Sequence, residues 1–304
     1  MSVAKMLAHD RLCRAMTGLT PQEFCALLPA FTAALARRAM AAYRHNPRRE
    51  RRPGGGRKLF APTPQEQLCF LLLYFKTYPT FDVLGFLYDR DRSRPCVAVA
   101  QLAPVLEATL GKKLVLPKRQ IRSVKEFFEA FPEVKEVFLD GTERPIQRPQ
   151  DPQRQTANYS GKKKRHTRKN LILATRKKWI GYLSPTVEGK AHDFSILKDL
   201  QLPDHIPKAI RFRMDSGFQG FEREFPGHAV SMPTKKPKGR PLCRTFKEQN
   251  HRKSRLRILV EHAIGGVKRF RSVADVFRSR REGADDRAMV IACGLWNYHL
   301  AHAS

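Results

Sequence analysis

Apolar side chains in the N-terminal part of the chain recur at the spacing of an amphipathic helix. Over residues 20–43 they follow one another mostly at intervals of three or four positions. Thr20 precedes Pro21, and this order places an N-cap before a proline at the first helical position. The pattern predicts a helix over 20–43. The arginine- and glycine-rich residues 44–62 that follow predict a flexible basic linker.

A second helical region is expected over residues 63–110. Its apolar periodicity is interrupted at 77–79 and again at the polar turn 89–92, which divides the region into three helices. Three short helices with a polar turn before the last have the layout of a helix-turn-helix, although many three-helix bundles share it. Both interpretations stay open on the pattern alone.

From about residue 130 the periodicity changes to that of strands. Val134–Asp140 contains a short apolar run before its terminal carboxylate, and Ile210–Asp215 alternates between apolar and charged residues. Two further apolar runs flank Arg176-Lys177-Lys178 and predict a hairpin. Other elements are expected at 194–200, 229–232, 250–270 and 285–301. This succession predicts an α/β domain of about five strands with late helices.

Composition excludes several classes of protein. The chain has 304 residues, of which 41% are apolar, so it can bury a sizeable core. Its longest apolar run, Leu68–Phe75, is far shorter than the roughly 20 residues that span a bilayer. The six cysteines form no Cys-x-x-Cys pair, which argues for a reducing compartment. The sequence also lacks a glycine-rich phosphate loop, so a nucleotide-driven motor is not expected.

Charge changes the picture most. The chain carries 58 Lys and Arg against 28 Asp and Glu, a net charge of +30. Basic residues concentrate in 144–178 and in 235–257, with a single acidic residue in each segment. Such a surface favours nucleic acid as the partner, while an acidic membrane or ribosomal RNA are alternative explanations of the same charge.

Isolated carboxylates stand out in so basic a chain. Asp140 and Asp215 each close a predicted strand and precede a glycine-containing turn, which is where α/β folds present site residues. Aspartate before a turn is also ordinary turn chemistry. On the predicted helix 250–270, Glu261 lies in line with Arg257 and Lys268, although Arg257 and Glu261 could form a simple surface pair.

Three converging carboxylates would repel one another unless a cation bound them. Oxygen ligands alone favour Mg²⁺ or Mn²⁺. A pair of such ions supports phosphodiester chemistry, and basic walls suit a DNA substrate.

Short motifs follow one another from Val134 to the C-terminus. They are Phe138-Leu139-Asp140-Gly141-Thr142-Glu143-Arg144-Pro145, Tyr159-Ser160-Gly161-Lys162-Lys163-Lys164, Gly189-Lys190-Ala191-His192-Asp193, Asp215-Ser216-Gly217-Phe218-Gln219-Gly220, Pro233-x-Lys235-Lys236-Pro237 and Val260-Glu261-His262. In content and order they resemble the DDE transposase domain shared by bacterial insertion-sequence transposases and PIF/Harbinger elements. The N-terminal part is similar to the helix-turn-helix segment that often precedes that domain.

The resemblance implies an α/β fold, with a ribonuclease-H-like mixed sheet flanked by helices and preceded by an all-α helix-turn-helix domain. It divides the chain into an N-terminal helix and basic linker (1–62), a helix-turn-helix domain (63–125) and a catalytic domain (126–304). The implied activity is that of a DNA transposase, which cleaves transposon ends and joins their 3′-hydroxyls to target DNA.

In that family the matching carboxylates, here Asp140, Asp215 and Glu261, are catalytic and bind Mg²⁺, with Mn²⁺ as a substitute and a pair of ions in the site. The implied partner is double-stranded DNA, as inverted repeats and as target. A homodimer or larger assembly is expected on DNA, and no membrane is involved. The expected location is the cytoplasm and nucleoid of a bacterium, or the nucleus of a eukaryote.

The same resemblance implies roles for further residues. DNA contacts are expected from Lys162, Lys163, Lys164, Arg257, Lys268, Arg51 and Arg52. His192 and Asp193 are expected to support the site or position DNA, although Asp193 could simply N-cap a helix starting at Phe194. Ser254 stands where related transposases have tyrosine, and Phe218 stands where tyrosine is frequent.

Three alternatives remain on the sequence. One is a nuclease that cuts without strand transfer, and another is a domesticated, non-catalytic DNA-binding protein. The third is an RNA-binding or ribosome-associated protein, which would explain the charge but gives the carboxylates no use.

Overall fold

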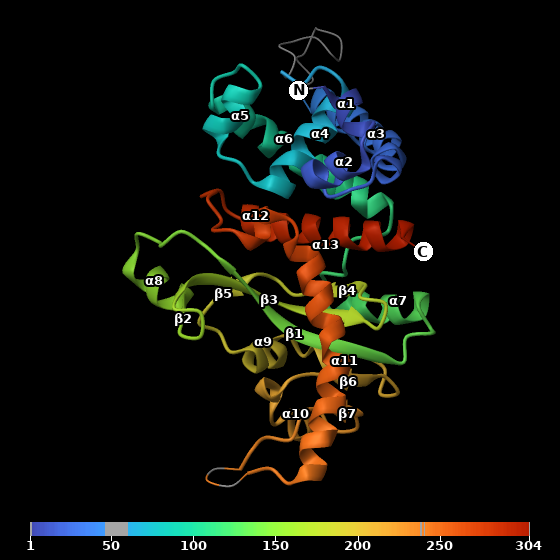
Figure 1. Ribbon diagram of the computed structural model, residues 1–304, viewed down its shortest axis with the longest axis vertical. Coiled ribbons are helices and arrows are strands. Elements are labelled where there is room, and N and C mark those ends of the chain that lie inside the picture. The colour runs from blue at the N-terminus through green and yellow to red at the C-terminus, as the bar shows by residue number, and fades with distance from the viewer. Residues whose placement is uncertain (1, 46–59, 238, 240, 304) are drawn as a thin grey trace. The chain divides into compact units, whose positions relative to one another are not determined.

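A computed structural model describes residues 2–45, 60–237, 239 and 241–303 (Figure 1). The described residues form two compact units. Unit 1 consists of 1–116, 268–275 and 281–304, and unit 2 consists of 117–267 and 276–280. The chain therefore returns to unit 1 after completing most of unit 2.

Within its described residues, unit 1 is built from helices. They are α1 (Val3–Leu7), α2 (Asp10–Thr17), α3 (Pro21–Arg44), α4 (Pro64–Thr77), α5 (Phe81–Leu87), α6 (Ser93–Lys112), α12 (Arg271–Ala274) and α13 (Ala284–His302). The helix predicted over 20–43 is confirmed as α3, and the three predicted over 63–110 are confirmed as α4, α5 and α6. The basic linker predicted at 44–62 falls mostly on residues 46–59, which lie outside the described residues.

A buried polar network ties the start of α3 to α13. Thr20 and Glu23 form a capping box, in which the Glu23 N–H donates to Thr20 Oγ1 (3.0 Å) and the Thr20 N–H donates to Glu23 Oε2 (2.7 Å). The other carboxylate oxygen of Glu23 lies 2.7 Å from Nδ1 of His299, and the hydroxyl of Tyr298 donates to the Glu23 carbonyl (3.0 Å). These bonds satisfy a glutamate that is only 3% exposed.

By length and composition, α3 could also cross a membrane, since its mean hydropathy is 1.3. A helix in a protein core meets the same criterion. In this structure Phe24, Leu27 and Phe31 of α3 are fully buried within unit 1.

Unit 2 is organised around a mixed sheet. Its strands are β1 (Glu136–Pro145), β2 (Tyr159–Ser160), β3 (Arg165–Thr175), β4 (Ile180–Leu183), β5 (Val187–Glu188), β6 (Arg211–Arg213) and β7 (Val230–Ser231). On one side of β1, β3 pairs with it antiparallel, and β2, β4 and β5 all pair with β3. On the other side, β6 runs parallel to β1 and β7 parallel to β6. The predicted hairpin is confirmed as β3 and β4.

Helices and turns of unit 2 surround this sheet. They are α7 (Arg122–Ala130), α8 (Pro152–Asn158), α9 (Asp193–Leu200), α10 (Phe221–Glu224), α11 (Arg244–Lys268) and the 3₁₀ turns η1 (Leu202–His205) and η2 (Ser216–Phe218). Aromatic and aliphatic side chains from α7, α9 and α10 join Val137, Leu139 and Phe212 in one core. Figure 1 shows α11 as a long helix that runs past β1, β6 and β7.

Strand β1 departs from the prediction. Asp140 was expected to end a strand, but β1 continues to Pro145 because Gly141 to Pro145 keep pairing in register with Leu171 to Thr167 of β3. The basic segment predicted to begin near Arg144 therefore belongs partly to two paired strands. Asp140 consequently lies in the middle of its strand.

The three predicted segments distribute over both units. Segment 1–62 and most of segment 63–125 lie in unit 1. Segment 126–304 supplies the sheet and α11 to unit 2, and α12 and α13 to unit 1.

We expect Thr20→Ala to lower the free energy of unfolding by about 1 kcal/mol, because the Glu23 N–H loses its capping acceptor. Thr32→Ala is the matched control, since Thr32 is an exposed threonine inside the same helix. Chemical denaturation of both variants measures the difference. Equal stabilities for the two variants would show that the cap contributes nothing.

Candidate active site

Asp140 lies on β1 at the centre of the sheet, and Asp215 lies two residues beyond the parallel strand β6, which ends at Arg213 and not at Asp215 as predicted. The parallel register aligns Phe138 of β1 with Arg213 of β6. Asp215 follows Arg213 by two residues, as Asp140 follows Phe138 by two, so both lie at the same end of this parallel pair. The charge of Asp215 raises the pKa of Asp140, so the two carboxylates are within electrostatic reach of each other.

Backbone amides orient both carboxylates. Asp140 Oδ1 accepts from the N–H of Gly141 (2.8 Å), and Asp215 Oδ1 accepts from the N–H of Gly217 (2.7 Å). Asp215 caps the 3₁₀ turn η2, as its place after a strand predicts. Each aspartate keeps its second oxygen for another partner.

The environment of Asp140 disfavours its ionised form. The pKa of Asp140 rises from its usual 3.8 to about 6, mainly because the side chain is buried; the Gly141 N–H lowers the pKa, the charge of Asp215 raises it, the charge of Arg257 lowers it and the charge of Asp193 raises it. Burial therefore makes the ionised form of Asp140 costly in the metal-free protein. A divalent cation bound by carboxylate oxygens would offset that cost.

Glu261 is not gathered into this pair. It lies on α11 with its side chain 55% exposed, and its carboxylate pairs with Arg257 at 3.2 Å. This is the surface pair that the sequence left open as an alternative. Arg257 itself is 26% exposed, and its charge also lowers the pKa of Asp140, so it interacts with both Glu261 and Asp140.

The carboxylates that the structure describes here form an incomplete ligand set for a metal ion. Among the residues that the structure describes, no three His, Cys, Asp or Glu side chains are close enough together to hold an ion. The two aspartates nevertheless fit a hard cation, because both supply carboxylate oxygens and the charge of one acts on the other. A third carboxylate would have to approach from α11.

A second charged cluster, formed by Lys169, Asp193 and Glu143, lies next to Gly141. Lys169 of β3 is 7% exposed and its ammonium lies 3.0 Å from Asp193 and 3.6 Å from Glu143, while donating to the Ala191 carbonyl (2.7 Å). The carboxylate of Asp193 presses against Gly141, where a Cβ atom would lie 2.6 Å from it. This cluster therefore fixes the backbone next to Asp140.

Asp193 is not the N-cap of α9. The cap is His192, whose Nδ1 accepts from the Phe194 N–H (3.3 Å), while Asp193 starts the helix. The reason is that the Asp193 carboxylate is drawn toward the buried ammonium of Lys169. Sequence reasoning passed over Lys169 because it lies within a long basic run, although its position opposite Glu143 on a buried strand distinguishes it from its solvated neighbours.

The predicted DNA-contacting residues have different environments. Lys162, Lys163 and Lys164 form an exposed turn between β2 and β3. Lys268 ends α11 and is half-buried in unit 1. Arg51 and Arg52 lie outside the described residues.

A comparison with known protein families matches the part of the chain that contains these carboxylates. Residues 139–297, more than half of the chain, match the family model of a DDE superfamily endonuclease. The chain belongs to the DDE endonuclease superfamily. Membership of this DDE superfamily implies the use of divalent metal. The DDE match begins one residue before Asp140 and includes Asp215 and Glu261.

A relative is similar to this DDE protein over more of the chain than the family model covers. The chain is 29% identical over 255 residues to a probable transposase for insertion sequence element IS702 of Microchaete diplosiphon. The alignment covers 84% of this chain and 86% of that protein. The resemblance to DDE-type transposases is thereby confirmed. No solved structure matches.

We expect Asp140→Asn to stabilise the metal-free protein at pH 7. The pKa of Asp140 is higher in the folded state, near 6, than its usual 3.8, so the folded protein holds the proton more tightly. The resulting cost grows as pH rises from about 4 to 6 and is fully present at pH 7, where it amounts to at most about 3 kcal/mol. Urea unfolding in chelator at pH 7 and pH 4 measures the difference between variant and wild type. It should be large at pH 7 and small at pH 4, and equal stability at pH 7 would contradict the interpretation.

We expect Gly141→Ala to lower the free energy of unfolding by about 1–3 kcal/mol, because the new methyl group meets a carboxylate that Lys169 holds in place. Gly265→Ala is the control. That glycine lies in α11 with no atom within 4 Å of its would-be Cβ, so alanine should stabilise by about 0.5–1 kcal/mol. A neutral Gly141→Ala would mean that the Asp193 carboxylate can move aside.

Proposed function

We propose that this protein is a DNA transposase, which cleaves transposon ends and joins the freed 3′-hydroxyls to target DNA. The observation that carries the proposal is the position of Asp140 on β1 and of Asp215 just beyond the parallel strand β6, where the charge of Asp215 acts on the buried Asp140. The mixed sheet flanked by helices supports the ribonuclease-H-like assignment. The IS702 relative supports the transposition chemistry.

In the proposed site, Asp140 and Asp215 hold Mg²⁺, or Mn²⁺ as a substitute, and Glu261 completes the ligand set when it leaves Arg257. Two such ions, when bound, would stabilise negative charge on the attacking and leaving oxygens of an in-line phosphoryl displacement. In the first reaction, the oxygen of water bonds to phosphorus, the phosphorus–O3′ bond breaks, and the 3′-hydroxyl takes the proton. In the second reaction, that 3′-hydroxyl attacks a target phosphodiester and displaces a new 3′-hydroxyl.

Residues of this chain would position the DNA. Arg257 would exchange its partner, binding a phosphate of the cleaved strand instead of Glu261, because a phosphate and a carboxylate offer the same guanidinium a similar pair of oxygens. Lys268 would contact the same strand, and Arg51 and Arg52 would contact DNA from the segment between α3 and α4. His192, exposed at the start of α9, would act beside them.

The helical part would recognise the transposon ends. Helices α4, α5 and α6, with the polar turn at 89–92 before α6, fit a helix-turn-helix that binds the terminal inverted repeats. This proposal keeps residues 63–125 as the recognition segment, 1–62 as the preceding helix and linker, and 126–304 as the catalytic segment. Pairing of two ends requires a homodimer or larger assembly on the DNA.

One observation favours a second candidate, a domesticated DNA-binding protein that no longer cuts. Glu261 is paired with Arg257 and is not gathered with the aspartates, so the cluster of acidic side chains in the structure lacks its third member. DNA binding would persist in such a protein without cleavage.

Glu261→Gln separates these candidates. If Glu261 completes the metal site, the variant should lose Mg²⁺-dependent cleavage of a plasmid carrying the DNA that flanks the gene, because a neutral amide is a poor ligand for Mg²⁺. Its affinity for the same DNA should stay within about tenfold, or about 1.4 kcal/mol, of wild type. Gel analysis of cleavage and fluorescence anisotropy measure the two quantities.

Glu248→Gln is the matched control for that experiment. Glu248 lies on the same helix, is 57% exposed, and also pairs with an arginine four residues away, Arg244, at 3.0 Å. It should cleave like wild type. Equal cleavage by both variants would remove Glu261 from the site, and a wild type that binds without cutting would favour the second candidate. A plasmid-integration assay with pre-cleaved ends then distinguishes strand transfer from simple nuclease activity.

A further inference from the structure

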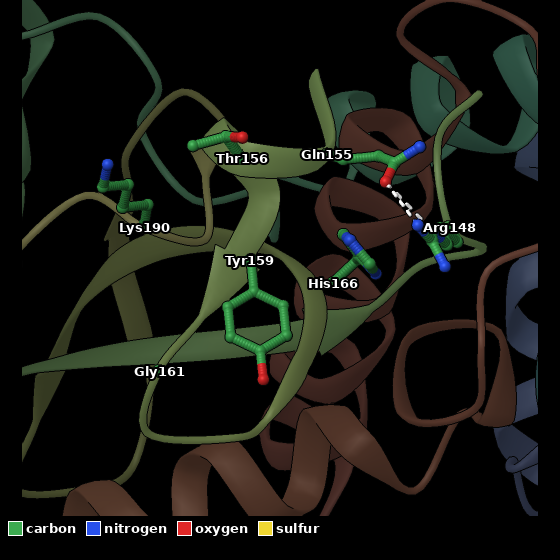
Figure 2. A pocket seen from close by; sticks show the side chains of 7 residues that line it. All are labelled: Arg148, Gln155, Thr156, Tyr159, Gly161, His166 and Lys190. Atoms are coloured by element: carbon green, nitrogen blue, oxygen red, sulfur yellow. Dashed lines mark hydrogen bonds between the residues drawn. The ribbon is translucent and has the colours of Figure 1, made fainter. Parts of the chain in front are cut away.

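An open groove of about 710 Å³ lies in unit 2 on residues that the proposed mechanism does not use. Its lining residues are Arg148, Gln155, Thr156, Tyr159, Gly161, His166 and Lys190. They come from the segment after β1, from α8, from β2 and β3, and from the segment after β5, and they surround the ring of Tyr159 in Figure 2. The volume falls within the roughly 300–1,000 Å³ typical of ligand sites.

An exposed aromatic pair forms part of the wall. Tyr159 is 43% exposed, and its ring meets that of His166 edge-on, with centroids 5.6 Å apart and planes at 71°. The backbone fixes this pair, since Tyr159 and His166 are directly opposite each other in the ladder between β2 and β3. An aromatic face held open in this way can accept a flat ring by stacking.

Cations surround the aromatic pair. The guanidinium of Arg148 is held by two hydrogen bonds to Gln155 Oε1, at 3.0 and 2.8 Å from its Nε and Nη2 atoms (Figure 2). Lys190 lines the same groove and is exposed. None of the lining residues is acidic. The groove is therefore suited to an anion as well as to a ring.

The lysine turn continues this positive surface. Lys162, Lys163 and Lys164 follow the lining residue Gly161 and are all exposed. Hydrogen bonds from the Lys163 N–H to Ser160 Oγ (3.2 Å) and from the Lys164 N–H to the Ser160 carbonyl (2.8 Å) shape the turn. Three ammonium groups are thus presented next to Tyr159 by a defined backbone.

A ring acceptor combined with phosphate-binding cations points to a nucleotide with a free base. A lone phosphate would have no use for the aromatic pair, and in duplex DNA each base face is covered by its neighbours. We propose that this groove binds an unpaired nucleotide of DNA, with its base stacked on Tyr159 and its phosphates held by Arg148, Lys190 and the lysine turn. The inference rests on the proposed function for its choice of DNA and adds a single-strand subsite to it.

The test is a binding measurement on the full chain in chelator, so that no cleavage is read. The probe is a labelled duplex with a three-nucleotide thymidine tail, and its partner probe carries an abasic tail that keeps the phosphates but lacks the bases. Wild type should bind the thymidine tail roughly 5- to 100-fold more tightly, from a stacking contribution of about 1–3 kcal/mol per base. Tyr159→Ala should reduce that preference to about twofold or less, and Tyr159→Trp should keep it, because stacking needs the ring and not the hydroxyl.

Phe246→Ala is the matched control, since Phe246 is an aromatic of similar exposure (44%) in the same unit and does not line the groove. It should keep the preference for the thymidine tail. Equal binding of the two tails by wild type, survival of the preference in Tyr159→Ala, or its loss in Phe246→Ala would overturn the proposal. Tighter binding of a ribonucleotide tail would make RNA the ligand and overturn it as well. A protein that fails to cleave but shows the predicted pattern would contradict the transposase proposal and leave this subsite standing.

Discussion

The rest of unit 2 is constrained by two neighbouring carboxylates, Asp140 and Asp215, near the centre of its sheet. The parallel pairing of β1 with β6 brings Asp215, two residues beyond β6, into electrostatic reach of Asp140, and the burial of Asp140 is the main reason that its ionised form is costly. An arrangement that costs stability in the metal-free protein persists because it is built into the strand register, which slides only if every side chain on β1 changes face. Two cations offset negative charge near these aspartates. Lys169 neutralises Asp193 and Glu143, and the charge of Arg257 offsets part of the charge of Asp140.

Sequence patterns predicted the elements well where the pattern is local. Thr20-Pro21 and Thr63-Pro64 marked helix starts that the structure places at the same residues, since a cap and a first-turn proline need no tertiary partner. The predicted end of β1 at Asp140 was wrong, because the length of this strand is decided by its pairing with β3 and not by its own residues. The short elements β2, β5 and α10 have too few residues to carry a period.

Residues of the candidate site could be predicted from the sequence, whereas their contacts in space could not. Asp140 and Asp215 were found because acidic residues beside glycine turns are rare in so basic a chain. Their adjacency, and the pairing of Asp193 with Lys169 in place of a helix cap, depend on a sheet order that spacing along the chain does not contain. The roles of the site residues and the division of the chain into three segments therefore stay predictions.

The return of the chain to unit 1 has a consequence for biosynthesis. Glu23 near the N-terminus is satisfied by Tyr298 and His299 of α13, and the Asn297 amide donates to the Val115 carbonyl (2.9 Å). These partners emerge from the ribosome after nearly all of unit 2 has been translated. The helical unit, which carries the proposed end-recognition helices, thus completes its core only when translation reaches α13, and a message cut short before that point yields a nascent chain without that capacity.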